Sequence, residues 1–276
     1  MSIDTSPLII AVAPNGAYKG AADHAALPIS AQQIAHTAAA CANEGAGMLH
    51  LHVRDAQGGH SLDADTYRRT IDAVHNAVGD RLLIQVTTEA AGKFQAPAQM
   101  ALVRELQPDC VSLAIRELVP DAASESAAAE FFAWVCDAGI IPQFILYSGE
   151  EVRRYQALRE RGVIPALALP LLFVLGRYSH GQTSDPRALL PFLNELSHDA
   201  PWMVCAFGAA EHRCAATAAA LGGHVRVGFE NNLLLKDGSP AGSNADLVMQ
   251  VREVAAAIGR PLADGSMARA MLQPRI

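Results

Sequence analysis

Eight short apolar runs alternate with longer amphipathic runs along nearly the whole chain, and this alternation constrains the fold more than any other feature. The short runs are rich in Val, Ile and Leu and are mostly bounded by Gly, Pro, Asp or Asn, as buried parallel strands are. The predicted strands are Leu8–Ala13, Gly47–Val53, Leu82–Thr87, Cys110–Ile115, Ile141–Leu146, Ala166–Val174, Trp202–Phe207 and Val225–Phe229. The predicted helices are Ser30–Glu44, Asp63–Val78, Pro97–Leu106, Ala122–Asp137, Glu150–Arg161, Pro186–Leu196, Ala209–Leu221 and Ser243–Ile258.

Strict alternation of eight strands with eight helices indicates parallel βαβ units, which can form a closed barrel or an open doubly wound sheet. The barrel is favoured because no glycine-rich phosphate loop follows the first strand, where a dinucleotide-binding sheet would have one. The pair Gly222-Gly223 precedes the eighth strand and is typical of a helix stop. A length of 276 residues suits one (β/α)₈ TIM barrel, so we expect a single TIM-barrel domain over residues 1–276.

Composition excludes several classes of protein. Hydrophobic residues make up 51% of the chain and the net charge is -7, with charges of both signs interspersed, which argues against nucleic-acid binding. The longest apolar run, Val163–Leu175, contains two prolines and is too short to span a membrane. The segment Met1–Leu8 lacks the features of a signal peptide. Five scattered cysteines without CxxC spacing fit small buried side chains in a reducing compartment, so we predict a cytoplasmic protein.

Two histidines lie two residues apart in the second predicted strand. Residues at this spacing point to the same face of a strand, so His50 and His52 project together. They lie near the carboxyl end of the strand, which is the active-site end of a barrel. Two imidazoles form half of a zinc site, and a third ligand and an open position would complete a catalytic one. The alternative is a pair of polar residues that cap the strand.

A carboxylate follows the eighth predicted strand at the same end of the barrel. Glu230 can converge with the two histidines because the second and eighth strands both neighbour the first. Two His and one Glu form an established catalytic zinc set, although they also suit other transition metals. Arg226 lies four residues earlier on the same face, where it can pair with a carboxylate of the substrate or form a buried structural ion pair.

These two stretches resemble the metal-bearing motifs of the β-keto acid cleavage enzyme family. The first is His-Leu-His-Val-Arg-Asp at 50–55, and the second is Gly-Gly-His-Val-Arg-Val-Gly-Phe-Glu-Asn-Asn at 222–232. The likeness also includes Phe173–Gly176 and extends from the first strand to a C-terminal helix at Ala263–Leu272. It therefore covers nearly the whole chain.

The resemblance implies a zinc-dependent TIM-barrel enzyme that is a homo-oligomer, a dimer or a tetramer. Its partners would be a β-keto acid and acetyl-CoA, and its products acetoacetate and a new acyl-CoA. Zn²⁺ would be bound by His50, His52 and Glu230 and would polarise the β-keto acid. The implied catalytic residues are Arg226, Asn231 and Thr87, and the implied substrate-binding residues are Asn15, Thr88, Glu89, Ser112 and Arg116.

The chain departs from the family pattern around the barrel mouth. Asn231 stands where the family has an Asp as the proposed general base, and an amide cannot accept a proton at neutral pH. The usual Gly-Gly after the Ser/Thr-Thr pair is Glu89-Ala90, and the usual small polar segment after the fourth strand is Ala114–Glu117. The Gly-Arg-His segment expected after the seventh strand is replaced by Gly208–His212.

These departures leave three hypotheses for the function. The family reaction can persist on an altered substrate, with Arg116, Glu117, Glu89 or His212 supplying new contacts and Glu89 or His212 a replacement base. Alternatively, the barrel can be a different zinc-dependent lyase or hydrolase that uses metal-activated water. The third hypothesis is a non-catalytic member of the family, since a fold does not determine a function.

Overall fold

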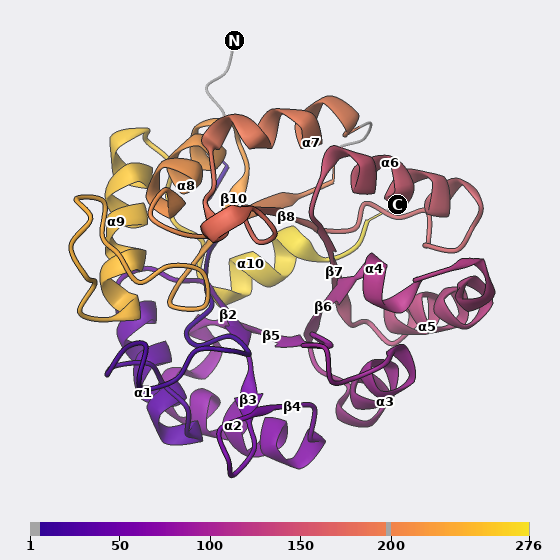
Figure 1. Cartoon of the computed structure of the whole chain (residues 1–276), viewed down its shortest axis with the longest axis horizontal. Helices are drawn as coiled ribbons and strands as arrows, with labels where there is room; N and C mark the ends of the chain where they lie inside the picture. Colours follow the sequence, from indigo (N-terminus) through magenta and orange to yellow (C-terminus); the bar gives the residue numbers. More distant parts are fainter. Residues whose placement is uncertain (1–5, 197–199, 276) are drawn as a thin grey trace.

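The structure, a computed structural model, describes residues 6–196 and 200–275 and contains a closed barrel of eight parallel strands surrounded by helices (Figure 1). The barrel strands are β1 (Ile10–Val12), β2 (Met48–Leu51), β5 (Leu83–Thr87), β6 (Cys110–Ala114), β7 (Ile141–Leu146), β8 (Leu171–Leu175), β9 (Trp202–Ala206) and β10 (His224–Val227). They neighbour one another in chain order, and β10 pairs with β1 to close the ring. The predicted TIM barrel is confirmed.

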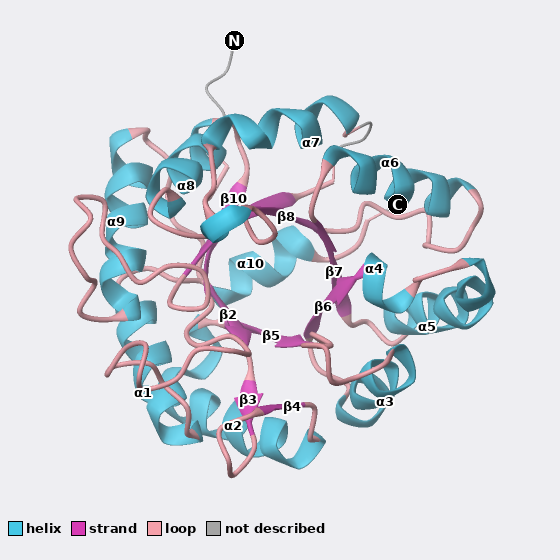
Figure 2. Ribbon diagram, in the orientation of Figure 1, coloured by secondary structure: helices cyan, strands magenta, loops and turns pink. Residues whose placement is uncertain are grey.

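Most of the helices lie around the outside of the barrel, whereas the C-terminal one lies behind its centre (Figure 2). Their bounds are α1 (Ala31–Asn43), α2 (Ala64–Val78), α3 (Ala96–Leu106), α4 (Ile115–Leu118), α5 (Glu125–Asp137), α6 (Gly149–Glu160), α7 (Leu190–Glu195), α8 (Glu211–Ala220), α9 (Asn244–Ala257) and α10 (Gly265–Leu272). The start of α1 follows from its sequence: Ser30 Oγ accepts a hydrogen bond from the Gln33 backbone, and Gln33 Oε1 accepts one from the Ser30 backbone. This reciprocal capping box satisfies amides that the first helical turn leaves unpaired.

Several predicted bounds differ from the structure. The strand predicted at 166–174 is β8, which begins only at Leu171 because Pro170 has no N–H to donate to a strand ladder. The segment 186–189 forms a separate 3₁₀ helix before α7. A small antiparallel pair, β3 (Val53–Arg54) and β4 (His60–Ser61), was not predicted. The prediction that no signal peptide is present was made on Met1–Leu8, and residues 1–5 of this segment lie outside the described residues.

Side chains alternate between the two faces of each barrel strand. Met48, Leu83 and Ile141 point into the barrel and pack with Leu272 of α10, which closes the end where the strands begin. Leu49, Ile84 and their equivalents point outward into the core shared with the helices. Because α10 closes one end, polar side chains can gather only at the other, where the strands end.

All five cysteines are free, and four of them are buried, with Cys136 partly exposed. Among the described residues, no helix combines the length and the apolar character needed to cross a membrane.

Candidate active site

Three potential metal ligands meet where β2 and β10 end. His50 Nε2 lies 3.1 Å from His52 Nε2 and 3.7 Å from Glu230 Oε2, and His52 Nε2 lies 3.3 Å from the same oxygen. In a tetrahedral zinc site with bonds of about 2.0–2.1 Å, ligand atoms are about 3.3 Å apart. Glu230 Oε2 is buried and accepts no hydrogen bond from a described residue. The three donor atoms therefore fit a shared cation.

A glycine directs Glu230 toward the histidines. Gly228 follows β10 with φ of 136°, and a side chain there would place its Cβ 2.4 Å from the Ala13 carbonyl oxygen. The chain can therefore turn closely against β1 only with glycine at this position. After the turn, the Glu230 backbone N–H donates to the Ala13 carbonyl at 3.1 Å.

Burial and neighbouring charges hold His50 and Glu230 in the protonation states that metal binding needs. Burial, and then the Arg226 guanidinium, hold the pKa of His50 well below its usual value. Burial by itself would raise the pKa of Glu230, but Arg226, His52 and His50 hold that pKa well below its usual range. Arg226 reaches Glu230 Oε1 at 3.2 Å, which leaves Oε2 directed at the imidazoles. His50 is therefore held as a neutral imidazole and Glu230 as a carboxylate, the forms that bind metal.

Gln85, on β5, contacts the candidate metal site, and sequence reasoning did not identify it. Its Oε1 lies 2.7 Å from His50 Nδ1, while its Nε2 donates to Gln143 Oε1 at 3.0 Å. This arrangement places the ring hydrogen of His50 on Nδ1 and leaves Nε2 free to bind a cation. The only signal in the sequence was that Gln85 is an amide side chain in the middle of an apolar strand, at a position that faces the inside of the barrel.

Replacing Gln85 with leucine is therefore expected to weaken zinc binding by about 10- to 100-fold, the usual effect of removing a partner that orients a metal-binding histidine. Competition with a chromophoric chelator would measure the affinity. Gln143→Leu is the matched control, because Gln143 contacts Gln85 but not His50. Equal zinc affinity in the Gln85→Leu and unmodified proteins would contradict this role.

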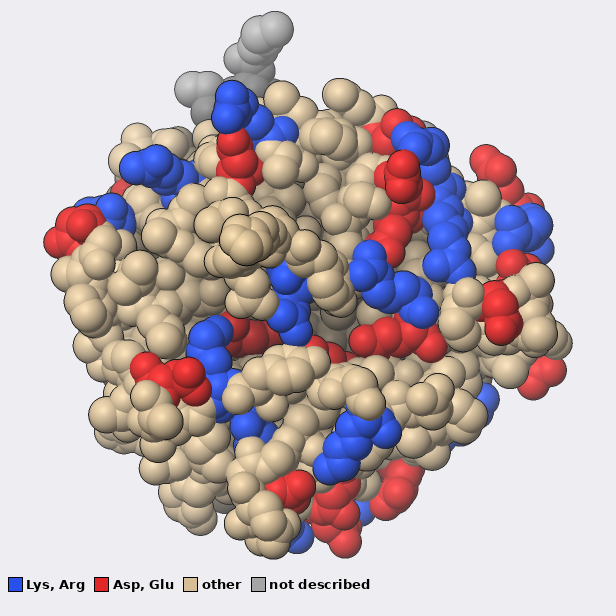
Figure 3. All heavy atoms as spheres, in the orientation of Figure 1, with Lys and Arg blue, Asp and Glu red and all other residues tan. Residues whose placement is uncertain are grey.

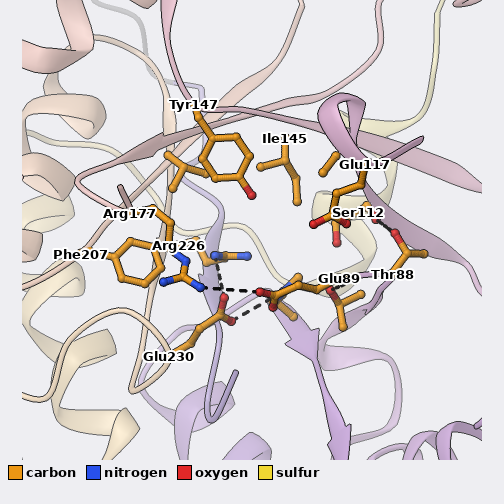
Figure 4. Close-up of a pocket in the computed structure, with 14 residues that line it drawn as sticks. Thr88, Glu89, Ser112, Glu117, Ile145, Tyr147, Arg177, Phe207, Arg226 and Glu230 are labelled. Atoms are coloured by element: carbon orange, nitrogen blue, oxygen red, sulfur yellow. Dashed lines mark hydrogen bonds and ion pairs between the residues drawn. The ribbon is translucent and has the colours of Figure 1, made fainter. Parts of the chain in front are cut away.

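A hollow of about 430 Å³ opens beside the ligands (Figure 4). Among the described residues it is lined by His50, Thr87, Thr88, Glu89, Ser112, Ala114, Glu117, Ile145, Tyr147, Val174, Arg177, Phe207, Arg226 and Glu230. Figure 3 shows acidic and basic side chains together around the hollowed centre of this face.

Five of the predicted site residues besides the ligands line this hollow. Arg226 projects from β10, and its Nε is buried without a partner among the described residues. Thr87 Oγ1 accepts a hydrogen bond from the Glu89 backbone, and Thr88 Oγ1 donates to the Ser112 carbonyl. Burial raises the pKa of Glu89, and the nearby Glu230 carboxylate adds to this increase. These contacts place both threonines and Glu89 along one rim.

The remaining predicted residues lie elsewhere. Asn15 is at the outer mouth, where its Nδ2 donates to the His52 carbonyl at 3.4 Å. Arg116 does not line the hollow and pairs with Glu151 at 2.5 Å. Asn231 does not line the hollow, and both its side-chain polar atoms are buried without partners among the described residues. His212 lies on α8, also away from the hollow.

Arg177 and Tyr147 were not singled out in the sequence, although both line the hollow. Arg177 follows Phe173–Gly176 at the end of β8, and its guanidinium lies 3.9 Å from Glu89 Oε1. Tyr147 follows β7 in the same way. Their position directly after a barrel strand was the available signal, because this is where the strands of a barrel present active-site groups.

Glu211, a buried carboxylate on α8, holds the loop that carries Glu230. It accepts hydrogen bonds from the Gly228 backbone at 3.2 Å and from Asn232 Nδ2 at 3.1 Å. Burial raises its pKa to about 8. The folded protein therefore binds a proton that the unfolded chain releases near pH 4.5, so this group's contribution to stability falls as the pH rises from about 4.5 to 8.

Between pH 6 and pH 8, Glu211 is expected to reduce the free energy of unfolding by about 2 kcal/mol. Urea unfolding of the unmodified protein and of Glu211→Gln at both pH values would isolate this effect, because other titrating groups are common to both proteins. The difference in the free energy of unfolding between the unmodified protein and Glu211→Gln should change by about 2 kcal/mol between pH 6 and pH 8. An unchanged difference would contradict the raised pKa.

Comparisons with known proteins identify the same family that the two histidine- and glutamate-containing motifs resemble. The family model of the β-keto acid cleavage enzymes matches residues 7–273. The chain is 31% identical to the 3-oxoadipate:acetyl-CoA acetyltransferase of Cupriavidus necator, covering 97% of this chain and 95% of that protein. It is 28% identical to the 3-keto-5-aminohexanoate cleavage enzyme of Acetoanaerobium sticklandii, covering 96% and 97%. The solved structure of apo ObcA superposes with a TM-score of 0.72 at 15% identity, covering 91% of this chain and 66% of that one, which shows the shared fold.

Proposed function

We propose that this chain, which belongs to the β-keto acid cleavage enzyme family, converts a β-keto acid and acetyl-CoA into acetoacetate and a new acyl-CoA, with zinc held by His50, His52 and Glu230. The observation that carries the proposal is the convergence of these three ligands beside a hollow at the carboxyl ends of the barrel strands. Zinc bound there supplies Lewis-acid polarisation of the substrate's oxygen atoms.

Arg226 orients the substrate in this proposal. One nitrogen of its guanidinium lies against Glu230, and its buried Nε has no partner among the described residues. A substrate carboxylate in the hollow would satisfy that Nε and remain next to the metal ligands. Burial keeps this interaction away from competing water, which strengthens it.

In this proposal Glu89 is the general base, which accepts the proton that the β-keto acid loses during the reaction. Asn231 cannot take a proton, and its side chain does not line the hollow. Glu89 does line it, with Oε2 3.9 Å from His52 Nδ1, so the carboxylate lies close to the proposed metal without being one of its ligands. His212, the other candidate base, lies outside the hollow.

The substituent on the β-keto acid is not determined by family membership. Of the two relatives named above, one has 3-oxoadipate in its name, a substrate with a second carboxylate, and the other has an aminohexanoate. These substituents carry opposite charges at neutral pH. The pocket of each protein must therefore select its own substituent.

The test is incubation of the zinc-loaded protein with acetyl-CoA and β-keto acids that carry neutral, cationic or anionic substituents. Mass spectrometry would follow acetoacetate and the new acyl-CoA, and we expect both to form. Product that forms without any CoA thioester would instead support a lyase or hydrolase that uses water. Substrate binding without turnover would support a non-catalytic protein. Activity that appears only in an Asn231→Asp variant would contradict the role of Glu89.

The homo-oligomeric state stays a prediction of the family resemblance. Sedimentation velocity of the zinc-loaded protein would measure it, and a dimer or tetramer is the expected result.

A further inference from the structure

Glu117 lies across the barrel from Glu230, one of the three candidate metal ligands. It belongs to α4, directly after β6, whereas Glu230 follows β10. These two strands are four positions apart in the ring of eight, so they stand opposite each other. Both carboxylates line the same hollow, and Figure 4 shows them on its opposite sides. A substrate held beside Glu230 could therefore extend its substituent across the hollow toward Glu117.

The Glu117 carboxylate is held in place through one of its oxygens. Its Oε2 accepts hydrogen bonds from the Ala90 backbone at 3.0 Å and from Gln99 Nε2 at 2.7 Å. Gln99 is only 1% exposed, and its Nε2 also donates to the Thr88 carbonyl. The carboxylate is thus oriented before any ligand arrives. Its Oε1 accepts no hydrogen bond from a described residue, which leaves this oxygen available to the hollow.

The charged side chains that line the hollow have partners of opposite charge, except for Glu117. Arg226 pairs with Glu230, and Arg177 lies beside Glu89. Arg116, the chain neighbour of Glu117, is engaged by Glu151 and stacks on Tyr147, with 4.1 Å between the guanidinium carbon and the ring centre. Over residues 6–196 and 200–275, no Lys or Arg lies within ion-pair distance of Glu117.

A second acceptor lies on the same wall. Ser112 Oγ is buried, lines the hollow and has no hydrogen-bond partner among the described residues. Burial also raises the pKa of Glu117, which a positive charge nearby would reverse. A ligand group that donates hydrogen bonds and carries positive charge would satisfy both side chains.

We infer that Glu117 is a specificity-determining residue that selects β-keto acids whose substituent ends in a cation, such as an ammonium group. This inference rests on the proposed function for the position of the keto acid. A carboxylate substituent would face Glu117 with like charge, and a methyl group would leave both Glu117 Oε1 and Ser112 Oγ without a partner.

The test uses three β-keto acids of equal length whose substituents end in an ammonium, a methyl or a carboxylate group. Their dissociation constants from the zinc-loaded protein are measured by calorimetry without acetyl-CoA, and kcat/KM is measured with it. We expect the ammonium compound to be preferred over the methyl compound by about 10- to 100-fold, the range for a hydrogen bond to a charged group. In Glu117→Gln, which preserves the shape of the side chain, this ratio should fall by a similar factor.

Glu130→Gln on the outer face of α5 is the matched control, because it changes the net charge equally and should keep the ratio. Equal binding of the three compounds, preference for the carboxylate, or an unchanged ratio in Glu117→Gln would overturn the inference. Preferential binding of the ammonium compound that depends on Glu117, with no turnover of any compound, would support the inference and contradict the proposed acyl transfer.

Discussion

Replacing His50 with alanine is expected to lower kcat/KM by about 10³-fold and to remove zinc from the purified protein. The imidazole supplies one of three ligand atoms, and its Nε2 lies within 3.7 Å of both the others. Lewis-acid stabilisation is worth several kcal/mol, and each 1.36 kcal/mol corresponds to about a tenfold change in rate. Metal content by mass spectrometry and the rate of acetoacetate formation would be measured on the same sample.

His75→Ala is the control for this experiment, because His75 lies exposed on α2, away from the hollow. It should keep both zinc and activity. If His50→Ala retained stoichiometric zinc and full activity, the proposed metal centre would be wrong. Zinc retained with activity lost would instead assign His50 to substrate contact.

Glu89→Gln is expected to lower kcat by about 10²–10⁴-fold, the usual contribution of a general base. The amide preserves the size of the side chain but cannot accept a proton. Zinc content should be unchanged, since Glu89 is not among the three ligands. Rates under single-turnover conditions would separate the proton-transfer step from product release.

Glu89→Asp also tests the role of Glu89 as the general base. It keeps the carboxylic acid but shortens the side chain by one methylene group. It should recover part of the lost rate, and the pH dependence of kcat should return with it. A Glu89→Gln enzyme with unchanged kcat would show that another group takes the proton. Because Glu89 also lies near Arg177, a change confined to KM would indicate substrate binding instead.

Local patterns in the sequence determined much of this protein. The alternation of apolar runs predicted the eight strands and their order, because buried parallel strands and the helices between them leave different periodicities. Period-two spacing placed His50 and His52 on one face, and it also placed Arg226 toward Glu230, where the structure shows an ion pair. The convergence of His50, His52 and Glu230 could be predicted because each lies at a strand end whose neighbours follow from the barrel order.

Only the tertiary structure decided which other side chains share the hollow. Arg116 and Glu117 are adjacent in sequence, yet the short helix α4 turns one toward Glu151 and leaves the other in the hollow. Asn231 directly follows Glu230 but does not line the hollow, and Gln85 reaches His50 from another strand. Periodicity specifies the face of a strand or helix, whereas contacts between residues 30 to 100 positions apart depend on how the closed barrel packs and where its loops turn.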